Sequence, residues 1–248
     1  MLKLDSLPDA TRRVFDHLAA NTLLREFTLI GGSALALQFG HRHSEDLDFW
    51  IPAERMDKES ISEVVRIAQQ AGFEAALTTP HQHIIFEKIN GRDLLAHAQD
   101  YVIGGVKVTF FARTDGAYRH FDSFPRIDNS TSFCIMGEEG LFAMKAHVIH
   151  QRVRSRDLHD LKMFLERGKR LGDIFQAASA ADPACSEEYA KAVLIGEVPL
   201  DKEDEGFASI GVTESMEGIH AFFKDIVDAY EQAVAEETRM DEDETPRP

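Results

Sequence analysis

The chain has 248 residues, 44% of them hydrophobic and 28% charged, which is typical of a folded globular protein and excludes wholesale disorder. Its formal net charge of -16 argues against a protein that coats nucleic acid with a broad basic surface, because phosphate binding needs clustered Lys and Arg. The two cysteines lack a CxxC motif, so the sequence indicates neither a disulfide framework nor a structural zinc site. Without a signal-peptide core or a long apolar run, we expect a cytoplasmic protein with no membrane helix.

The first half of the chain alternates between helical and strand patterns. An amphipathic helix is expected at 8–21, with Val14, Leu18 and Leu23 on its buried face, and a strand is expected at 25–30. Gly31-Gly32 then breaks the strand, and Ser33 is expected to cap a short helix. The elements predicted after this helix are a strand at 46–51, a helix at 58–72, strands at 73–78 and 82–89, an Asn90-Gly91 hairpin turn, and a strand at 106–111.

After Pro125 the pattern becomes helical. Helices are predicted at 137–152, at 155–168 with Ser155 as cap, and at 170–180, 186–195 and 213–236. The expected fold is therefore α/β or α+β, with a mixed sheet and flanking helices followed by a helical C-terminal part. The domain limits that we predict are 1–125 for the α/β core, 126–236 for the helical region and 237–248 for an acidic flexible tail.

The stretch TLIGGSALALQFGHRHSEDLDFWI at 28–51 contains acidic residues in an apolar, strand-like run. Side chains two apart in a strand share a face, so Asp46 and Asp48 are expected to point the same way. An unpaired buried carboxylate costs several kcal/mol, roughly, but two of them side by side are tolerable when a divalent cation lies between them. Oxygen ligands with room for phosphate oxygens favour Mg²⁺.

The turn Gly31-Gly32-Ser33 precedes this acidic pair at a predicted helix start. Backbone N–H groups, the positive end of the helix dipole and a hydroxyl together form a cradle for phosphate. A Gly-Gly turn alone is usually structural, and an Asp-x-Asp on an exposed edge strand is usually solvated surface. The combination of the turn with the acidic pair is much rarer and predicts nucleotide chemistry.

These residues resemble the nucleotidyltransferase superfamily, whose signature is Gly-Gly or Gly-Ser, a spacer, and then Asp-hydrophobic-Asp/Glu. More narrowly, GGSALALQFGHRHSEDLDFW is similar to the AbiEii/AbiGii toxin family of type IV toxin–antitoxin systems, including its Arg-x-Ser loop before the acidic pair. The segment AMKAHVIHQRVRSRDLHDLKMFL resembles the same family's Met-Lys helix and its later Asp-containing helix. The likeness spans roughly residues 28–165.

The resemblance implies a set of site residues. Asp46 and Asp48 would hold two Mg²⁺ ions, or Mn²⁺, and Gly31, Gly32, Ser33 and Arg42 would lie at the phosphates. Lys145 would contact the triphosphate, and Arg156, Asp157 and Asp160 would complete the site, with Asp160 among the catalytic residues. If the helices at 137–152 and 155–168 run on nearly continuously, Lys145, Arg152, Arg156 and Asp160 share one face. The alternative is that Arg156 and Asp160 form only an i,i+4 ion pair.

The implied reaction moves NMP from an NTP to an acceptor hydroxyl with release of pyrophosphate. The resemblance implies the tRNA 3′ end or a protein hydroxyl as the acceptor, and an antitoxin as the partner. The stretch from Lys145 to Arg170 contains eight basic and three acidic residues, so we expect it to contact the phosphates of a tRNA. Much of it is equally explained as an ordinary solvated helix face.

One position departs from the superfamily pattern. Many members carry a third carboxylate on a later strand, and Thr109 stands where we expect it. Asp115, Glu87 and Glu45 are the substitutes that the sequence offers, although none is at the expected place. The alternative function is therefore a weakly active or inactive nucleotide-binding module that acts through a protein partner.

Three histidine pairs offer a rival interpretation as metal ligands: His41 and His43, His81 and His83, and His147 and His150. Imidazole suits zinc, and a zinc hydrolase is the function that they would predict. No third ligand occurs at a recognisable spacing, so structural or surface histidines are favoured. The aromatic residues of the first half, Phe39, Phe49, Trp50, Phe110 and Phe111, are interpreted as core.

Overall fold

The computed structural model describes residues 2–128 and 131–244, without the side chains of 237, 238 and 240–244. By packing, this part of the chain divides into two compact units, Met1–Met144 with Ser209–Gly211, and Lys145–Ala208 with Val212–Pro248. Residues 126–144 thus pack with the first unit. The sequence-based division between a first domain and a helical region at 125/126 stays a prediction.

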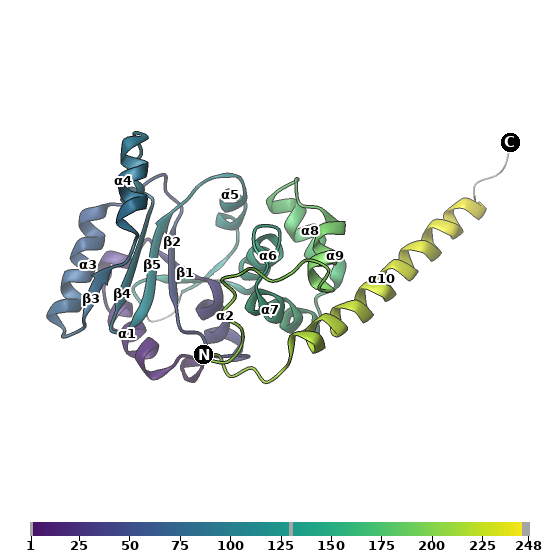
Figure 1. The fold of residues 1–248 in the computed structure, drawn as a ribbon, viewed down its shortest axis with the longest axis horizontal. Helices are drawn as coiled ribbons and strands as arrows, with labels where there is room; N and C mark the ends of the chain where they lie inside the picture. The colour runs from purple at the N-terminus through teal and green to yellow at the C-terminus, as the bar shows by residue number, and fades with distance from the viewer. Residues whose placement is uncertain (1, 129–130, 245–248) are drawn as a thin grey trace. The chain divides into compact units, whose positions relative to one another are not determined.

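The first unit is built on one mixed sheet with the strand order β3-β4-β5-β2-β1-β7-β6 among the described residues (Figure 1). The central strands are antiparallel β1 and β2, and β5 runs parallel to β2. The strands are β1 (Thr28–Ile30), β2 (Leu47–Ile51), β3 (Ala75–Leu77), β4 (Ala98–Ile103), β5 (Val106–Ala112), β6 (Arg126–Ile127) and β7 (Cys134–Met136).

Alternation along the central strands separates a core face from a half-exposed face. On β5, Val108 and Phe110 are fully buried, whereas Thr109 between them is half-buried. Phe110 stacks on Phe49 of β2 with ring centroids 5.4 Å apart, and Phe49 meets Phe133 edge-on. This aromatic core is what the sequence predicts for Phe49 and Phe110, and it leaves the opposite face of the sheet for polar residues.

Helices of the first unit pack beside this sheet or follow its strands. They are α1 (Asp9–Ala19), α2 (Gly31–Phe39), α3 (Lys58–Gln70), α4 (His81–Ile89), α5 (Gly116–Asp122) and the short 3₁₀ turns η1 (Leu4–Ser6), η2 (Thr22–Leu24) and η3 (Leu94–Ala96). Val14 and Leu18 of α1 are buried, as expected, but Leu23 is 39% exposed because the helix ends at Ala19 and Leu24 takes the buried place.

Two predictions for the segment 82–91 are wrong. The expected strand at 82–89 is helix α4, which follows Pro80 and carries exposed Ile85, Phe86 and Ile89. Its β-branched and aromatic residues favour a strand in a single-sequence view, and Asn90 caps this helix rather than forming a hairpin turn. Strand β4 was not predicted, and the hairpin instead joins β4 to β5 through Gly104-Gly105.

The second unit is helical. Its helices are the end of α6 (Glu138–Val148), followed by α7 (Ser155–Glu166), α8 (Leu171–Ala181), α9 (Glu187–Leu194) and α10 (Met216–Glu244). Leu158 and Phe164 of α7, Ile174 of α8 and Phe223 of α10 form part of its buried core.

Three details of this region differ from expectation. The helix α6 ends at Val148 and α7 begins at Ser155, so the two are not continuous. Ser155 is not a cap, because Arg154 holds that position and the Ser155 hydroxyl donates to Asp204. Helix α10 extends to Glu244, so the expected tail at 237–248 is helical as far as that residue, and 245–248 lie outside the described residues.

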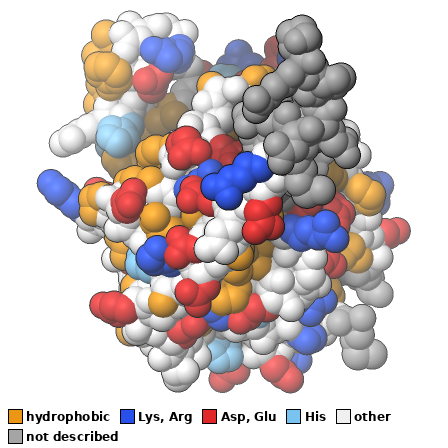
Figure 2. Space-filling view, turned by 90° about the vertical axis from the view of Figure 1, so that its right-hand side faces the viewer, with side chains coloured by type: hydrophobic (Ala, Val, Ile, Leu, Met, Phe, Trp, Pro, Cys, Tyr) orange, Lys and Arg blue, Asp and Glu red, His pale blue; other side chains and the backbone are white. Residues whose placement is uncertain are grey.

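Figure 2 shows acidic and basic side chains interspersed over the face that it presents. Within the described chain, no helix has the length and apolar character needed to cross a membrane.

Candidate functional site

The sheet brings the glycine turn and one acidic residue together. Strands β1 and β2 are antiparallel with Ile30 opposite Asp48, and the chain passes directly from Ile30 into α2 at Gly31. Gly31 has a φ of 74°, and a Cβ at this position would lie 2.9 Å from Asp48 Oδ2. The Asp48 carboxylate therefore faces the start of α2, and only glycine fits the turn without displacing it.

The loop before β2 is fixed against the first turn of α2 by Ser33. The Ser33 side chain is 1% exposed, its hydroxyl donates to the backbone carbonyl of Asp46, and its Oγ lies 2.9 Å from Ser44 Oγ. Since α2 begins at Gly31, Ser33 lies inside the helix and does not cap it, contrary to expectation. Its hydroxyl holds the loop that carries Asp46.

Arg42 places a positive charge at the same helix start. Its side chain is 7% exposed and donates to the carbonyl of His43, and a Cβ at Gly32 would lie 2.5 Å from Arg42 Nη2. The guanidinium thus covers Gly32, where the helix dipole is also positive. Both effects favour an anion at this end of α2.

A second carboxylate, which the sequence interpretation missed, lies in register with Asp48. The pairing of the strands sets Asp48 opposite Thr109 on β5, and Thr109 opposite Asp100 on β4. Residues opposite one another share a sheet face, and all three are half-buried. Thr109 Oγ1 donates to Asp100 Oδ1 at 2.8 Å. The position expected to hold a third carboxylate is thus a threonine bound to a carboxylate one strand further on.

The substitutes that the sequence offered for this third carboxylate have other contacts. Asp115 pairs with Arg113 at 2.6 Å, Glu87 of α4 pairs with Arg92, and Glu45 accepts a hydrogen bond from Ser209. Asp100 was missed because strand β4 was missed. The signal for it was the alternation of AQDYVI, in which Gln99, Tyr101 and Ile103 are buried and Asp100 is on the other face.

Among the residues expected from the helical region, a buried ionic cluster forms in the second unit. The Lys145 ammonium lies 2.5 Å from Asp157 Oδ1 and 2.7 Å from Asp160 Oδ2, and Arg152 Nε lies 2.9 Å from Asp157 Oδ2. Burial alone would raise the pKa of Asp157, but Lys145 and Arg152 outweigh it and hold that pKa below its ordinary value. Asp157 and Asp160 are three apart on α7, which sets both on the face of the helix that meets Lys145.

Arg156 has different contacts. Its Nε donates to the carbonyl of Gly206 and its Nη1 pairs with Glu205 at 2.9 Å. Arg152, which precedes α7, is the arginine that joins the Lys145 cluster. Lys145, Arg152, Arg156 and Asp160 therefore do not line one face of a continuous helix. The contact between α6 and α7 is made instead across the turn at 149–154.

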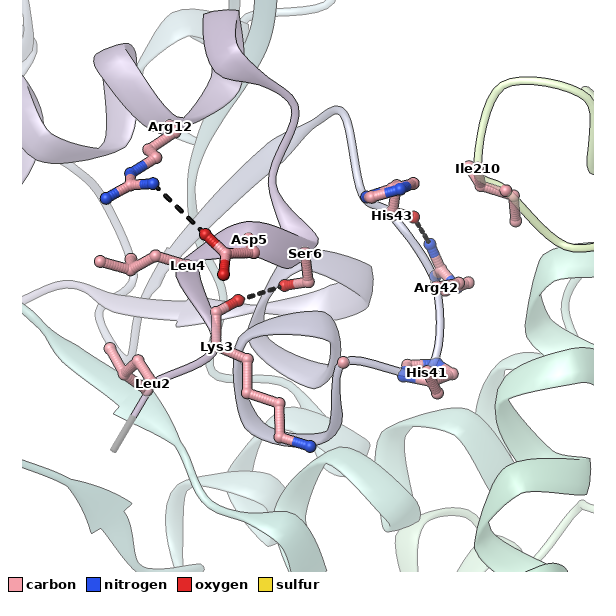
Figure 3. A pocket seen from close by; sticks show the side chains of 12 residues that line it. Leu2, Lys3, Leu4, Asp5, Ser6, Arg12, His41, Arg42, His43 and Ile210 are labelled. Carbon is pink, nitrogen blue, oxygen red and sulfur yellow. Dashed lines mark hydrogen bonds and ion pairs between the residues drawn. The ribbon is translucent and has the colours of Figure 1, made fainter.

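A basic pocket of about 600 Å³ lies beside Arg42 in the first unit (Figure 3). It is lined by the N-terminal residues 2–6, by Gly40 to His43 and by Ile210, whose carbonyl accepts from the backbone N–H of His43. Lys3, Arg12 and Arg42 contribute charge to the lining, and Arg12 pairs with Asp5 at 3.4 Å. Arg42 is thus shared between the pocket wall and the start of α2.

The donor set of the first unit suits a hard divalent cation. Asp48 faces the turn with a carboxylate oxygen. Strand β2 begins at Leu47, so Asp46 lies on the loop before it, anchored to α2 through its backbone carbonyl, and not on the strand face that was expected to hold both acidic side chains. Mg²⁺ requires such ligands and usually retains waters or phosphate oxygens in its remaining positions. The residues present therefore fit the kind of ion that the sequence resemblance implies.

Comparison with known proteins gives relatives in sequence and structure. An uncharacterized protein of Aquifex aeolicus is 26% identical over 161 residues, which cover 63% of this chain and 66% of the relative, just under two thirds of its length. A crystal structure of a putative nucleotidyltransferase from H. pylori matches 89% of this chain and 95% of its own at 16% identity and a TM-score of 0.48. MenT4, a nucleotidyltransferase toxin from Mycobacterium tuberculosis, matches 86% of this chain and 82% of its own, also at 16% identity, with a TM-score of 0.47.

The family comparison covers most of the chain. The model of the nucleotidyl transferase AbiEii toxin of type IV toxin–antitoxin systems matches residues 13–237. That range includes the Gly31 turn, the acidic pair and the Lys145 cluster. The chain belongs to the AbiEii nucleotidyl transferase toxin family.

Proposed function

We propose that this protein is a Mg²⁺-dependent nucleotidyltransferase that moves NMP from an NTP to an acceptor hydroxyl. The acceptor oxygen forms a bond to the α-phosphorus, the bond from that phosphorus to the bridging oxygen of the β-phosphate breaks, and pyrophosphate leaves. The observation that carries the proposal is the Asp48 carboxylate facing the glycine turn at the start of α2. Family membership supports the same reaction class.

In this proposal the start of α2 binds the triphosphate. The backbone N–H groups of the Gly31–Ser33 turn and the Arg42 guanidinium offset the negative charge, and Ser33 keeps the Asp46 loop in place. Asp46 and Asp48 hold the divalent ions, for which Mg²⁺ or Mn²⁺ is suited. When bound, such ions supply charge neutralisation at the phosphates and lower the pKa of the attacking hydroxyl.

Lys145 is proposed to act on the charge of the triphosphate, with Asp157 and Asp160 as the groups that fix its ammonium. Family membership supports this role, and the short contacts to Asp157 and Asp160 fix the ammonium within the second unit. An ammonium held by two carboxylates is preorganised, so its position costs nothing at the moment of reaction. Arg156 is proposed as a contact to nucleotide or acceptor from the same helix, α7.

The acceptor is proposed to be a tRNA 3′ end, with a protein hydroxyl as the alternative. The basic pocket beside Arg42 supports a phosphate-bearing acceptor. The type IV toxin–antitoxin family supports a cognate antitoxin as partner. We further propose that the reaction takes place in the cytoplasm, where NTPs and tRNA occur together.

A labelling experiment tests the reaction class. The protein is incubated with Mg²⁺, total tRNA or an extract, and each NTP labelled in turn at the α- or the γ-phosphate. Transfer of NMP moves the α-label into RNA or protein and leaves the γ-label in pyrophosphate. Movement of the γ-label instead would indicate a kinase and would contradict the proposal.

A second function is favoured by one observation, the threonine at the third carboxylate position. Thr109 places its carboxylate partner, Asp100, one strand away from the usual place, which favours a weakly active or inactive nucleotide-binding module. This module would bind NTP with Mg²⁺ and would transfer no label to any acceptor. Equilibrium dialysis with labelled NTP, run beside the transfer assay, separates the two functions.

A further inference from the structure

One histidine pair from the sequence has neighbours that its spacing did not reveal. In the second unit, His147 of α6 lies beside Asp182 and Cys185, which belong to the connection between α8 and α9. One ligand atom from each of these three residues lies within 4.8 Å of the other two. His147 is 5% exposed, so the imidazole is held in place by packing.

The separation of two of these atoms matches shared coordination of one metal ion. His147 Nδ1 and Cys185 Sγ are 3.6 Å apart. A tetrahedral Zn²⁺ with Zn–S of about 2.3 Å and Zn–N of about 2.0–2.1 Å sets its sulfur and nitrogen ligands about 3.6 Å apart. An S–H···N hydrogen bond also has this length, so the distance alone fits both an empty and a filled site. A hydrogen bond between His147 and Cys185 needs no carboxylate beside it, whereas a metal site needs a third ligand. The Asp182 carboxylate supplies that ligand.

A ligating histidine needs a hydrogen-bond partner at its other ring nitrogen, and Gln151 supplies one for His147. The Gln151 amide lies 2.7 Å from His147 Nε2. With Nδ1 on the metal, Nε2 carries the proton, and the Gln151 carbonyl oxygen accepts it once the amide turns over. Asp182 Oδ1 already accepts from the backbone N–H of Ala184, which orients this carboxylate towards the loop.

We propose that His147, Asp182 and Cys185 form a Zn²⁺ site that joins the end of α6 to the α8–α9 connection. Thiolate, imidazole and carboxylate ligands together favour Zn²⁺ over Mg²⁺, which is bound by oxygens. The Cys185 thiol releases its proton to solvent on binding, and water is the fourth ligand. The site uses none of the residues assigned to the proposed transferase reaction, so the two proposals stand independently.

The test uses the untagged, full-length protein, stripped of metal and titrated with Co²⁺ as an optical probe and then with Zn²⁺. One equivalent of Co²⁺ is expected to give a thiolate-to-cobalt charge-transfer band and the visible bands of a tetrahedral site, and Zn²⁺ is expected to displace it. Cys185→Ser should abolish the charge-transfer band, and Asp182→Asn should weaken Zn²⁺ binding by about tenfold or more. Cys134→Ser is the matched control and should behave as the wild type.

Asp48→Asn separates this site from the transferase site, because it should stop label transfer and leave the cobalt spectrum unchanged. Zn²⁺ should also raise the unfolding temperature of the wild type and of Cys134→Ser, but not of Cys185→Ser. Far-ultraviolet circular dichroism shows that each metal-free variant is folded. A charge-transfer band that is missing from the wild type, or that persists in Cys185→Ser, overturns the proposal.

Discussion

The Asp48, Thr109 and Asp100 side chains form a row across three strands, and the row predicts that Asp100 contributes to catalysis. Because the Thr109 hydroxyl proton is donated to Asp100, the Thr109 oxygen can only accept hydrogen bonds from, or coordinate, other groups. Asp100→Asn and Thr109→Val should each lower the transfer rate by about 10–100-fold, the usual effect of losing an outer-shell partner of a metal site. Single-turnover rates measured against Mg²⁺ concentration check this.

A rescue variant makes that prediction sharper. Thr109→Asp combined with Asp100→Asn moves the carboxylate one strand closer to Asp48 and should recover most of the lost rate. An exposed acid outside this row, Asp122, provides the control as Asp122→Asn. Unchanged rates in Asp100→Asn would remove Asp100 from the account.

Gly31 is expected to be irreplaceable for a steric reason. In Gly31→Ala the new Cβ meets Asp48 Oδ2 in a backbone conformation that disfavours side chains, so we expect about 1–2 kcal/mol lower stability and loss of transfer. Gly72→Ala is the matched control, since Gly72 also has positive φ but has nothing within 4 Å of the added Cβ. Urea unfolding and the transfer assay should show both variants destabilised and only Gly31→Ala inactive. Equal activity of the two would contradict the close approach.

The contact between α6 and α7 carries a pH dependence. The pKa of Asp157 is lowered in the folded protein, so its contribution to stability is complete above the ordinary Asp pKa and is lost as the pH falls through the lowered value. Asp157→Asn leaves Lys145 with less compensation in a buried place and should cost about 3–5 kcal/mol near neutral pH.

The measurement is the free energy of unfolding between about pH 6 and pH 2, the range in which a carboxylate with a lowered pKa titrates. The wild type should lose stability over the acidic part of this range, and the difference from Asp157→Asn should shrink there. The exposed pair of Lys224 and Asp228 on α10 supplies a control, because Asp228→Asn should change stability by less than about 1 kcal/mol. A constant difference between Asp157→Asn and wild type at all pH values would refute the assignment.

The sequence predicted the elements whose pattern lies within one short stretch of the chain, and it did not predict features that depend on contacts between distant residues. The turn at Gly31 and the strand with Asp48 were predictable because glycine, a short helix and an alternating strand succeed one another directly. The sequence of helix α4 is strand-like because Ile85 and Phe86 favour strands. The segment is nevertheless a helix, which begins directly after Pro80 and has no buried residue. The row through Asp100 and the approach of Asp182 to His147 depend on strand pairing and on helix packing, which one sequence does not encode at any fixed spacing.

The buried side chains that the structure describes on the C-terminal helix α10 all lie in its first half. On α10, Ile219, Phe223 and Val227 are buried, whereas the described side chains from 231 onward are exposed. Deleting 237–248 should therefore leave the unfolding temperature within about 2 °C of the full chain, since no buried side chain among the described residues is removed. Ending the chain before Val227 should lower the temperature clearly. Thermal unfolding monitored by circular dichroism compares the three chains.

The central claim is that Asp48 and the start of α2 form a catalytic nucleotide site. Its most direct test is α-labelled NTP with Mg²⁺ and tRNA, comparing wild type with Asp48→Asn after circular dichroism has shown both to be folded. We expect that the α-label enters the acceptor with the wild type, that the transfer stops without Mg²⁺, and that Asp48→Asn transfers none. Equal transfer by Asp48→Asn, or NTP binding by the wild type without transfer to RNA or protein, would contradict it.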